Sequence, residues 1–399
     1  MSHGITKEEL RSTMLADVSL CEETLELALP EMQILIRSNS MQLLNILRHY
    51  FQHIVSPIKS TSSVNDGIAI EVVAIESPVI NLDLPLHDWS REAGKRGKKD
   101  AYLDLDDGRC IYKVRTGMTF LQSLQHRIAA GPCITNSNQV INFINNQYIN
   151  LLQQRGYLIC HAAALAENNR AIAIAGFSGG GKSTTMLHLM SDPRFDYVTN
   201  DRLFIRADEE GMCARGIPKL PRVNPGTLLH NPQLKEILPQ ERIAELQDIP
   251  QQALWNLEEK YDVDIAAVYG ESRFSAEPEL AHFLILNWSH DSQVQTQVTE
   301  VNLAERSELL DAIMKSSGPF YQYADGSFYR DHTHLNRDAY ICMLAGVHVY
   351  EVSGRVDFEC VQQFCLQQLC EISPSYNTVT KSASETVRVD DGPKIRYPV

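Results

Sequence analysis

The sequence predicts an α/β protein in which a mixed α+β N-terminal domain precedes a larger α/β domain. The pattern between residues 157 and 190 passes from strand to turn, strand, glycine-rich loop and helix. Amphipathic helical stripes and segments rich in β-branched residues come before it. The length of 399 residues also exceeds one typical domain. We therefore expect domains at 1–150 and 151–373, followed by a polar, flexible tail at 374–399.

Composition excludes several classes of protein. A hydrophobic content of 44% is typical of a globular protein, and a formal net charge of -14 argues against a broad nucleic-acid-binding surface. No apolar run has the length needed to cross a bilayer, so we expect no membrane association and a cytoplasmic location. Nine scattered cysteines without a Cys-x-x-Cys pair fit a reducing compartment better than a disulfide framework.

The first ~55 residues are predicted to be helical. Ser40 is the expected N-cap of a helix with one apolar face. That face is formed by Leu43, Leu44, Leu47, Tyr50, Phe51 and Ile54. The β-branched stretch from Gly67 to Leu84 predicts a strand, and alternating segments on either side of Asp107-Gly108 predict a hairpin. The N-terminal domain should therefore combine helices and strands.

A second amphipathic helix is predicted from Val140 to Leu152, after a polar, cap-like run at 135–138. Its apolar residues recur at the spacing of one helical face. The elements expected after it are a strand at 157–166, a turn at 167–170, a strand at 171–175, a glycine loop, a helix at 183–190, and core strands at 283–288 and 347–352.

The glycine loop carries the clearest chemical signal. Residues 176–183 read Gly-Phe-Ser-Gly-Gly-Gly-Lys-Ser, which is the phosphate-loop pattern, and they stand between a predicted strand and a predicted helix. Glycines allow backbone N–H groups to turn inward around a phosphate, and the helix N-terminus favours negative charge. We expect ATP to contact Gly176, Ser178, Gly179, Gly180, Gly181, Lys182, Ser183 and Thr184. The alternative is a glycine-rich turn that only matches the pattern.

Each polar side chain of this loop has an expected role. Lys182 should bridge the β and γ phosphates, Ser183 should bind Mg²⁺, and Thr184 should support the first helical turn. A triphosphate site also needs an acidic group after a neighbouring strand. Asp201, which lies between two short apolar segments, is the candidate for the metal or the base role. The alternative is an aspartate that caps a turn.

These residues resemble the HPr kinase/phosphorylase family, whose P-loop fold is shared with PEP carboxykinase, and more closely the HPr-kinase-related kinases. The resemblance covers about residues 157–229. Its matching features are His161 in His-Ala-Ala-Ala-Leu on a hairpin strand, the hairpin turn at Asn168-Asn169, the loop from Gly176, Thr199-Asn200-Asp201-Arg202, and Arg215-Gly216-Ile217-Pro218.

The resemblance implies a PEP-carboxykinase-like P-loop domain in which Asp201 takes the proton of the substrate hydroxyl and His161 lies beside it. It also implies a homo-oligomer. Two positions depart from the family pattern. Asn200 replaces one member of an aspartate pair, and Cys213 replaces an acidic residue before Arg215. Asp201 would then combine metal and base roles, and the reverse phosphorylase reaction is less expected than the kinase reaction.

Other polar clusters are weaker candidates, and each has a structural alternative. A Pro-rich loop at 218–225 could cover the phosphates or be a rigid connector. The basic run at 91–99 is expected to be a solvated loop, and the regular cysteine series is expected to be buried rather than metal-bound. A metal pair at 331–334 lacks a third ligand, so it is a weak signal for a bound metal. The polar residues of the Pro-rich loop are Lys219, Arg222 and Asn224. The stretch at 331–334 contains Asp331, His332 and His334, and the cysteine series is Cys360, Cys365 and Cys370.

The leading functional hypothesis is an ATP-dependent kinase that phosphorylates a hydroxyl, with a Ser on a partner protein as the expected acceptor. A small-molecule kinase on the same fold is an alternative, because the loop specifies the donor and not the acceptor. An ATP- or GTP-hydrolysing switch is another, although the chain lacks an Asn-Lys-x-Asp guanine signature. The sequence does not identify the acceptor or the role of the N-terminal domain.

Overall fold

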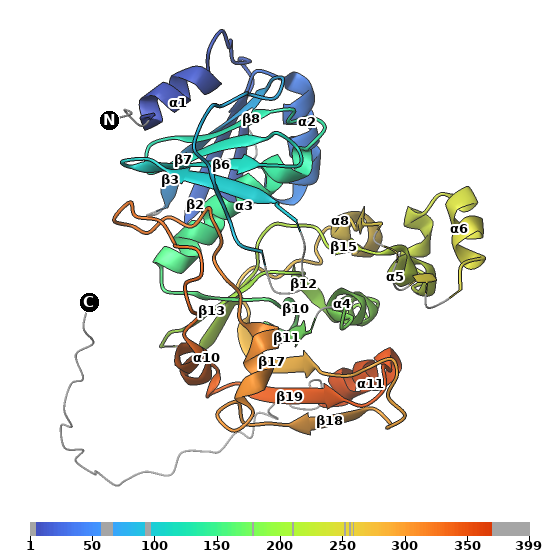
Figure 1. The fold of residues 1–399 in the computed structure, drawn as a ribbon. Helices are drawn as coiled ribbons and strands as arrows, with labels where there is room; N and C mark the ends of the chain where they lie inside the picture. Colours follow the sequence, from blue (N-terminus) through green and yellow to red (C-terminus); the bar gives the residue numbers. More distant parts are fainter. Residues whose placement is uncertain are drawn as a thin grey trace, which may run out of the picture.

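The computed structural model describes residues 5–56, 67–91, 97–177, 179–209, 211–250, 253–254, 257 and 259–368. Ser178, Cys370, part of the basic run and the tail at 374–399 therefore lie outside the described residues. In the described part the fold is mixed α/β, with an eight-stranded sheet, a nine-stranded sheet and a two-stranded ladder (Figure 1). No helix among these residues is both long enough and apolar enough to cross a membrane.

The N-terminal part is built on the eight-stranded sheet, whose strand order is β1-β2-β3-β8-β7-β6-β5-β4. Residues of α2 and α3 pack into one core with one face of the sheet, and residues of α1 pack against the other face. The element bounds are α1 (Lys7–Met14), β1 (Leu25–Leu29), β2 (Met32–Ser38), α2 (Met41–Tyr50), η1 (Gln52–Ile54), β3 (Ile68–Glu76), β4 (His87–Asp88), β5 (Asp100–Asp104), β6 (Gly108–Lys113), β7 (Thr119–Ser123), β8 (Arg127–Gly131) and α3 (Ser137–Gln154).

The prediction that the first ~55 residues are helical is wrong for 25–38, which form the antiparallel strands β1 and β2. Burial alternates along β2, as expected for a strand with one face in the core. Glu31 makes the turn between the strands with a φ of 60°. The later helix is confirmed as α2, and the Ser40 side chain accepts a hydrogen bond from the Leu43 N–H at 3.2 Å.

The second part is built on the nine-stranded sheet, in the order β12-β10-β11-β17-β14-β13-β9, with β19 beside β17 and β18 beside β19. Alternate residues of β11 face two separate cores, one shared with α4 and α11 and the other with α9 and α10. The bounds are β9 (Leu158–Cys160), β10 (Ala163–Glu167), β11 (Arg170–Gly176), α4 (Lys182–Met190), β12 (Asp196–Thr199), β13 (Leu203–Ala207), β14 (Met212–Arg215), β15 (Arg222–Val223), α5 (Pro225–His230), η2 (Lys235–Ile237), α6 (Gln240–Gln247), β16 (Tyr261–Asp262), α8 (Ile265–Tyr269), β17 (Glu279–Leu286), β18 (Gln297–Glu300), η3 (Ser307–Leu309), α9 (Leu310–Ile313), α10 (Arg337–Leu344), β19 (His348–Ser353) and α11 (Phe358–Gln368).

The expected strand at 157–166 is broken at His161 into two strands with different partners. β9 pairs with β13, whereas β10 pairs with β11 and β12. At the break the His161 N–H donates to the Ile313 carbonyl at 2.7 Å. The β10–β11 hairpin is confirmed, with Asn168 and Asn169 both at positive φ as a tight primed turn requires.

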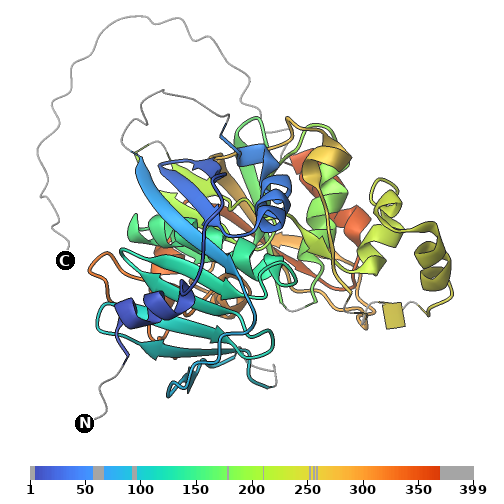
Figure 2. The same cartoon turned by 90° about the horizontal axis from the view of Figure 1, so that it is seen from above.

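Contacts between the two parts involve charged and hydroxyl groups. The guanidinium of Arg215 in β14 lies 2.6 Å from the Glu31 carboxylate of the N-terminal sheet and 2.9 Å from that of Glu277. The Tyr50 hydroxyl of α2 accepts a hydrogen bond from the Leu220 N–H at 3.0 Å. Helices α5 and α6 project from one side of the second part in both views (Figures 1 and 2).

We predict that Gly216→Ala lowers the free energy of unfolding by about 2 kcal/mol or more. An added Cβ would lie 2.0 Å from the Val198 carbonyl oxygen and 3.0 Å from the Thr199 Cβ, so backbone on the approach to Asp201 would have to move. Gly346→Ala is the matched control, because no atom lies within 4 Å of its added Cβ. Denaturant unfolding of both variants measures the difference. Equal stability of the two would contradict the close contact.

Candidate active site

Strand register gathers the candidate residues at one edge of the nine-stranded sheet. β11 ends at Gly176 and continues into the glycine loop. Antiparallel β10 begins beside this end, where Ala163 pairs with Ile174, and Ala164 pairs with Thr199 at the end of β12. The loop, the residues just before β10 and the residues just after β12 therefore lie together, as expected for a ligand site at strand ends.

The glycine loop forms a tight turn between β11 and α4. Gly179 and Gly181 have φ values of 77° and 83°, in the left-handed region that glycine adopts without steric cost. The Gly180 N–H donates to the Phe177 carbonyl at 2.9 Å, which closes the turn before α4 begins at Lys182. The predicted order of strand, loop and helix is therefore confirmed. Ser178 lies outside the described residues.

The polar residues at the start of α4 make different contacts. The Lys182 ammonium donates to the Gly176 carbonyl at 3.4 Å, so its side chain folds back over the loop. Ser183 is half-buried in the first turn of the helix. The Thr184 and Thr227 hydroxyls lie 2.8 Å apart, so Thr184 joins α4 to α5. Lys182 and Ser183 therefore lie in the first turn of α4, at a helix end that favours negative charge.

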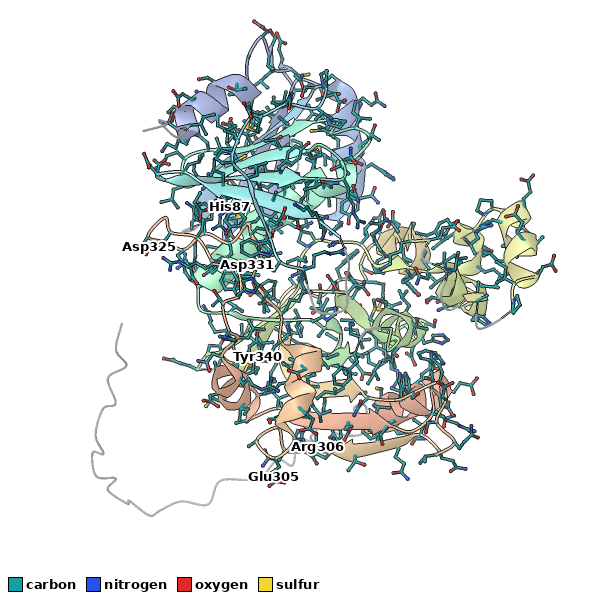
Figure 3. The ribbon with its side chains drawn as sticks, in the orientation of Figure 1. His87, Glu305, Arg306, Asp325, Asp331 and Tyr340 are labelled. Carbon is teal, nitrogen blue, oxygen red and sulfur yellow. The ribbon has the colours of Figure 1, made fainter. Side chains whose placement is uncertain are left out.

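His161 and Asp201, forty residues apart in sequence, lie in contact. His161 Nε2 is 3.3 Å from Asp201 Oδ1, and Arg202 Nε is 3.4 Å from Asp201 Oδ2. His161 stands at the break before β10 and not within a strand, which corrects the expected hairpin-strand position. Nearby, the Tyr340 hydroxyl of α10, labelled in Figure 3, donates to the Ile159 carbonyl at 2.6 Å and fixes β9.

The pair is an ionised carboxylate beside a neutral imidazole. Burial opposes ionisation of Asp201, but the hydrogen bond from His161 and the charges of Arg202 and Lys219 hold its pKa well below the usual range. The hydrogen bond to Asp201 favours protonated His161, yet burial and the charges of Lys182 and Lys315 outweigh it and lower its pKa. The Nε2–H of neutral His161 then donates to Asp201.

Lys219 is brought to the same site from the Pro-rich loop. Burial lowers its pKa, and the charge of Asp201 opposes that effect. Two tyrosines hold the backbone of this loop: the Tyr197 hydroxyl donates to the Lys219 carbonyl at 2.7 Å, and the Tyr50 hydroxyl binds the next residue. The sequence indicates Tyr50 only as part of an apolar helical face, and no local pattern distinguishes Tyr197 or Lys315 from packing residues or surface charges.

The remaining polar residues of the family resemblance and of the Pro-rich loop contact other parts of the fold. Arg215 is occupied by Glu31 and Glu277 between the two parts of the molecule, and Cys213 contacts the Tyr157 hydroxyl at 3.7 Å. Arg222 pairs with Asp262 at 3.0 Å. Asn224 is the N-cap residue of α5 without a side-chain capping bond. Of the three polar residues named in the Pro-rich loop, Lys219 interacts with Asp201.

The residues at 331–334 do not form a strand, because Asp331 and His332 lie in a turn, so the shared strand face that a metal pair would need is absent at these positions. Asp331, labelled in Figure 3, accepts a hydrogen bond from the Ser90 N–H at 2.8 Å, and His332 Nε2 lies 2.9 Å from the Ser90 hydroxyl. Cys365 is buried and Cys360 is partly exposed. Among the described residues, no group of three or more His, Cys, Asp or Glu side chains is arranged to hold a metal ion.

Oxygen donors for Mg²⁺ are nonetheless present beside the loop. Mg²⁺ in nucleotide sites takes one or two protein oxygens, and phosphates and water complete its shell. Asp201 is ionised, and the neighbouring Asn200 amide oxygen is buried without a hydrogen-bond partner. With the Ser183 hydroxyl, these groups are oxygen donors of the kind that Mg²⁺ takes.

Comparisons with known proteins add little to this geometry. No protein-family model matches the sequence, and no curated protein matches it. Among solved structures, the chain is similar to the Hpr(Ser) kinase/phosphatase from Coxiella burnetii, with a TM-score of 0.26 and 8% sequence identity over 54% of this chain and 97% of that chain. A likeness of this size carries no argument about function.

The electrostatics predict opposite pKa changes of His161 in two variants. Asp201→Asn should lower the pKa further, because the carboxylate that favours the imidazolium is removed. Lys182→Ala should raise it, because a cation that disfavours the imidazolium is removed. Histidine NMR titration, with His161→Gln to assign the signal, measures both. Shifts in the same direction, or none, would contradict the described arrangement.

Proposed function

We propose that this protein is an ATP-dependent kinase that transfers the γ-phosphoryl group to a hydroxyl. The observation that supports it best is the position of the His161–Asp201 pair at the same sheet edge as the glycine loop. A loop alone would support nucleotide binding only. A carboxylate beside the expected γ-phosphate position adds a group that can orient an attacking oxygen.

The loop residues bind and hold the donor. Backbone N–H groups of the glycine turn and the N-terminus of α4 provide hydrogen bonds and a favourable dipole for phosphate oxygens. Lys182 exchanges its long hydrogen bond to the Gly176 carbonyl for phosphate oxygens. Mg²⁺, held by Ser183 and Asp201, supplies charge neutralisation at the phosphates when bound.

Asp201 orients the acceptor hydroxyl and takes its proton late in the reaction. A carboxylate with a depressed pKa is a weak base towards a free alcohol, but phosphoryl transfer passes through a loose transition state in which little early deprotonation is needed. Neutral His161 donates to Asp201 and fixes the direction of its other oxygen. Lys219, which interacts with Asp201, can stabilise negative charge on the phosphoryl group while it is transferred.

The acceptor we propose is a serine hydroxyl on a partner protein, with a small-molecule hydroxyl as the alternative acceptor. An ATP-hydrolysing switch is a second candidate function, because the low pKa of Asp201 also suits a group that holds a metal and positions water. Incubation of the purified protein with γ-labelled ATP and a cell lysate distinguishes the three. The outcomes are a labelled protein, a labelled metabolite, or free phosphate alone.

Lys182→Ala should abolish transfer and weaken ATP binding while the fold is retained, because this ammonium compensates phosphate charge and its side chain is only half-buried. Calorimetric titration with MgATP and a transfer assay measure the two effects. Lys99→Ala, which removes an exposed lysine elsewhere, is the control for charge. Near-wild-type turnover in folded Lys182→Ala would refute the assignment of the loop.

Asp201→Asn should retain nucleotide binding and lose on the order of 10²–10⁴-fold in transfer, because the positioned carboxylate is removed. His161→Ala should lose less, since His161 acts through Asp201. Asp291→Asn, at an exposed carboxylate, should have no effect. If Asp201 mainly holds the metal, raised Mg²⁺ recovers part of the rate. Full activity of Asp201→Asn at ordinary Mg²⁺ would exclude both roles.

A further inference from the structure

Trp288 makes a direct contact with the glycine loop that no phosphate-loop pattern specifies. It follows the end of β17 by two residues, and β17 ends beside the end of β11, where Leu286 pairs with Gly176. Its indole Nε1–H donates to the Gly180 carbonyl at 2.8 Å. The side chain therefore reaches the loop from the neighbouring parallel strand.

An aromatic cluster holds Trp288 in this position. Its ring packs edge-to-face on Phe358, the first residue of α11, with centroids 5.2 Å apart and an interplanar angle of 84°. Phe358 in turn stacks on His188 of α4, at 5.6 Å and 3°. A Cβ added to Gly181 would lie 2.8 Å from the Phe358 ring, so the loop packs closely against this cluster.

The contact fixes the direction of one peptide group. In a trans peptide the C=O and the following N–H point in opposite directions. With the Gly180 carbonyl bound to Trp288, the Gly181 N–H points away from the aromatic cluster, towards the opposite side of the loop. Consecutive glycines rotate freely without such a restraint, and ordering them at the time of binding would cost conformational entropy.

We propose that Trp288 is a positioning residue that preorganises the Gly180–Gly181 peptide for phosphate binding. The inference rests on the proposed nucleotide-binding function. Trp288 does not touch the reacting atoms, so it should affect the affinity for the triphosphate more than the chemical step. The ligand whose affinity depends on Trp288 is a nucleoside triphosphate or any polyphosphate that occupies the loop.

Trp288→Phe tests this role, because phenylalanine keeps a ring against Phe358 and removes the N–H donor. We expect the Kd and the KM for MgATP to rise about tenfold, as for loss of one preorganising hydrogen bond, with a smaller change in kcat. The unfolding midpoint should stay within a few degrees of wild type. Trp89→Phe is the matched control, because Trp89 packs on Tyr102 and Arg109 in the N-terminal part.

A second measurement does not depend on the stability of Trp288→Phe. In protein labelled with 5-fluorotryptophan, the signal that persists in both Trp89→Phe and Trp255→Phe belongs to Trp288. It should shift when MgATP or inorganic triphosphate is added to the wild-type protein. Wild-type binding with unchanged Trp288→Phe affinity, or with an unshifted Trp288 signal, would overturn this role alone. Failure of the wild-type protein to bind either compound would refute the proposed function and this role together.

Discussion

The candidate site depends on the register of three adjacent strands, β10, β11 and β17. Antiparallel pairing of β10 with β11 places His161 beside the end of β11, and parallel pairing of β11 with β17 places Trp288 there as well. His161 therefore lies on the β10 side of the end of β11 and Trp288 on the β17 side, although both are separated from the glycine loop in sequence. A shift of one residue in this register would turn the alternating side chains of β11 to the opposite cores, so packing on both faces maintains the geometry of the site.

Basic side chains surround the His161–Asp201 pair. Burial and the charges of Lys182 and Lys315 lower the pKa of His161 against its hydrogen bond to Asp201. The hydrogen bond from His161 and the charges of Arg202 and Lys219 lower the pKa of Asp201 against burial. Arg215 lies outside this group. It forms ion pairs with Glu31 and Glu277 and joins the two parts of the molecule. The hydroxyl groups of Tyr50 and Tyr197 form hydrogen bonds with the backbone of the loop that carries Lys219. Tyr50 belongs to the N-terminal part, so this contact joins that part to the loop at the site.

Local sequence patterns predicted the features that depend on one residue type at one position. The glycine loop, the Asn168-Asn169 turn and the Ser40 cap each require a residue type at a fixed position, and each is present in the structure. The proximity of His161 to Asp201 was expected from the family resemblance alone. Contacts that depend on strand register, such as those of Trp288 and Tyr50, have no local signature. The strands β1 and β2 were missed because short amphipathic runs fit either period until their partners are known.

The most direct test of the central claim is a crystal structure with Mg²⁺ and a non-hydrolysable ATP analogue, in which distances from the γ-phosphate to Lys182 and Asp201 are measured. We predict that the Lys182 ammonium leaves the Gly176 carbonyl and contacts the β and γ phosphates, and that the Asp201 carboxylate lies within direct or water-mediated reach of the metal or the γ-phosphate. A nucleotide bound away from the glycine loop, or an Asp201 carboxylate beyond water-mediated reach of both, would contradict a kinase active site at this sheet edge.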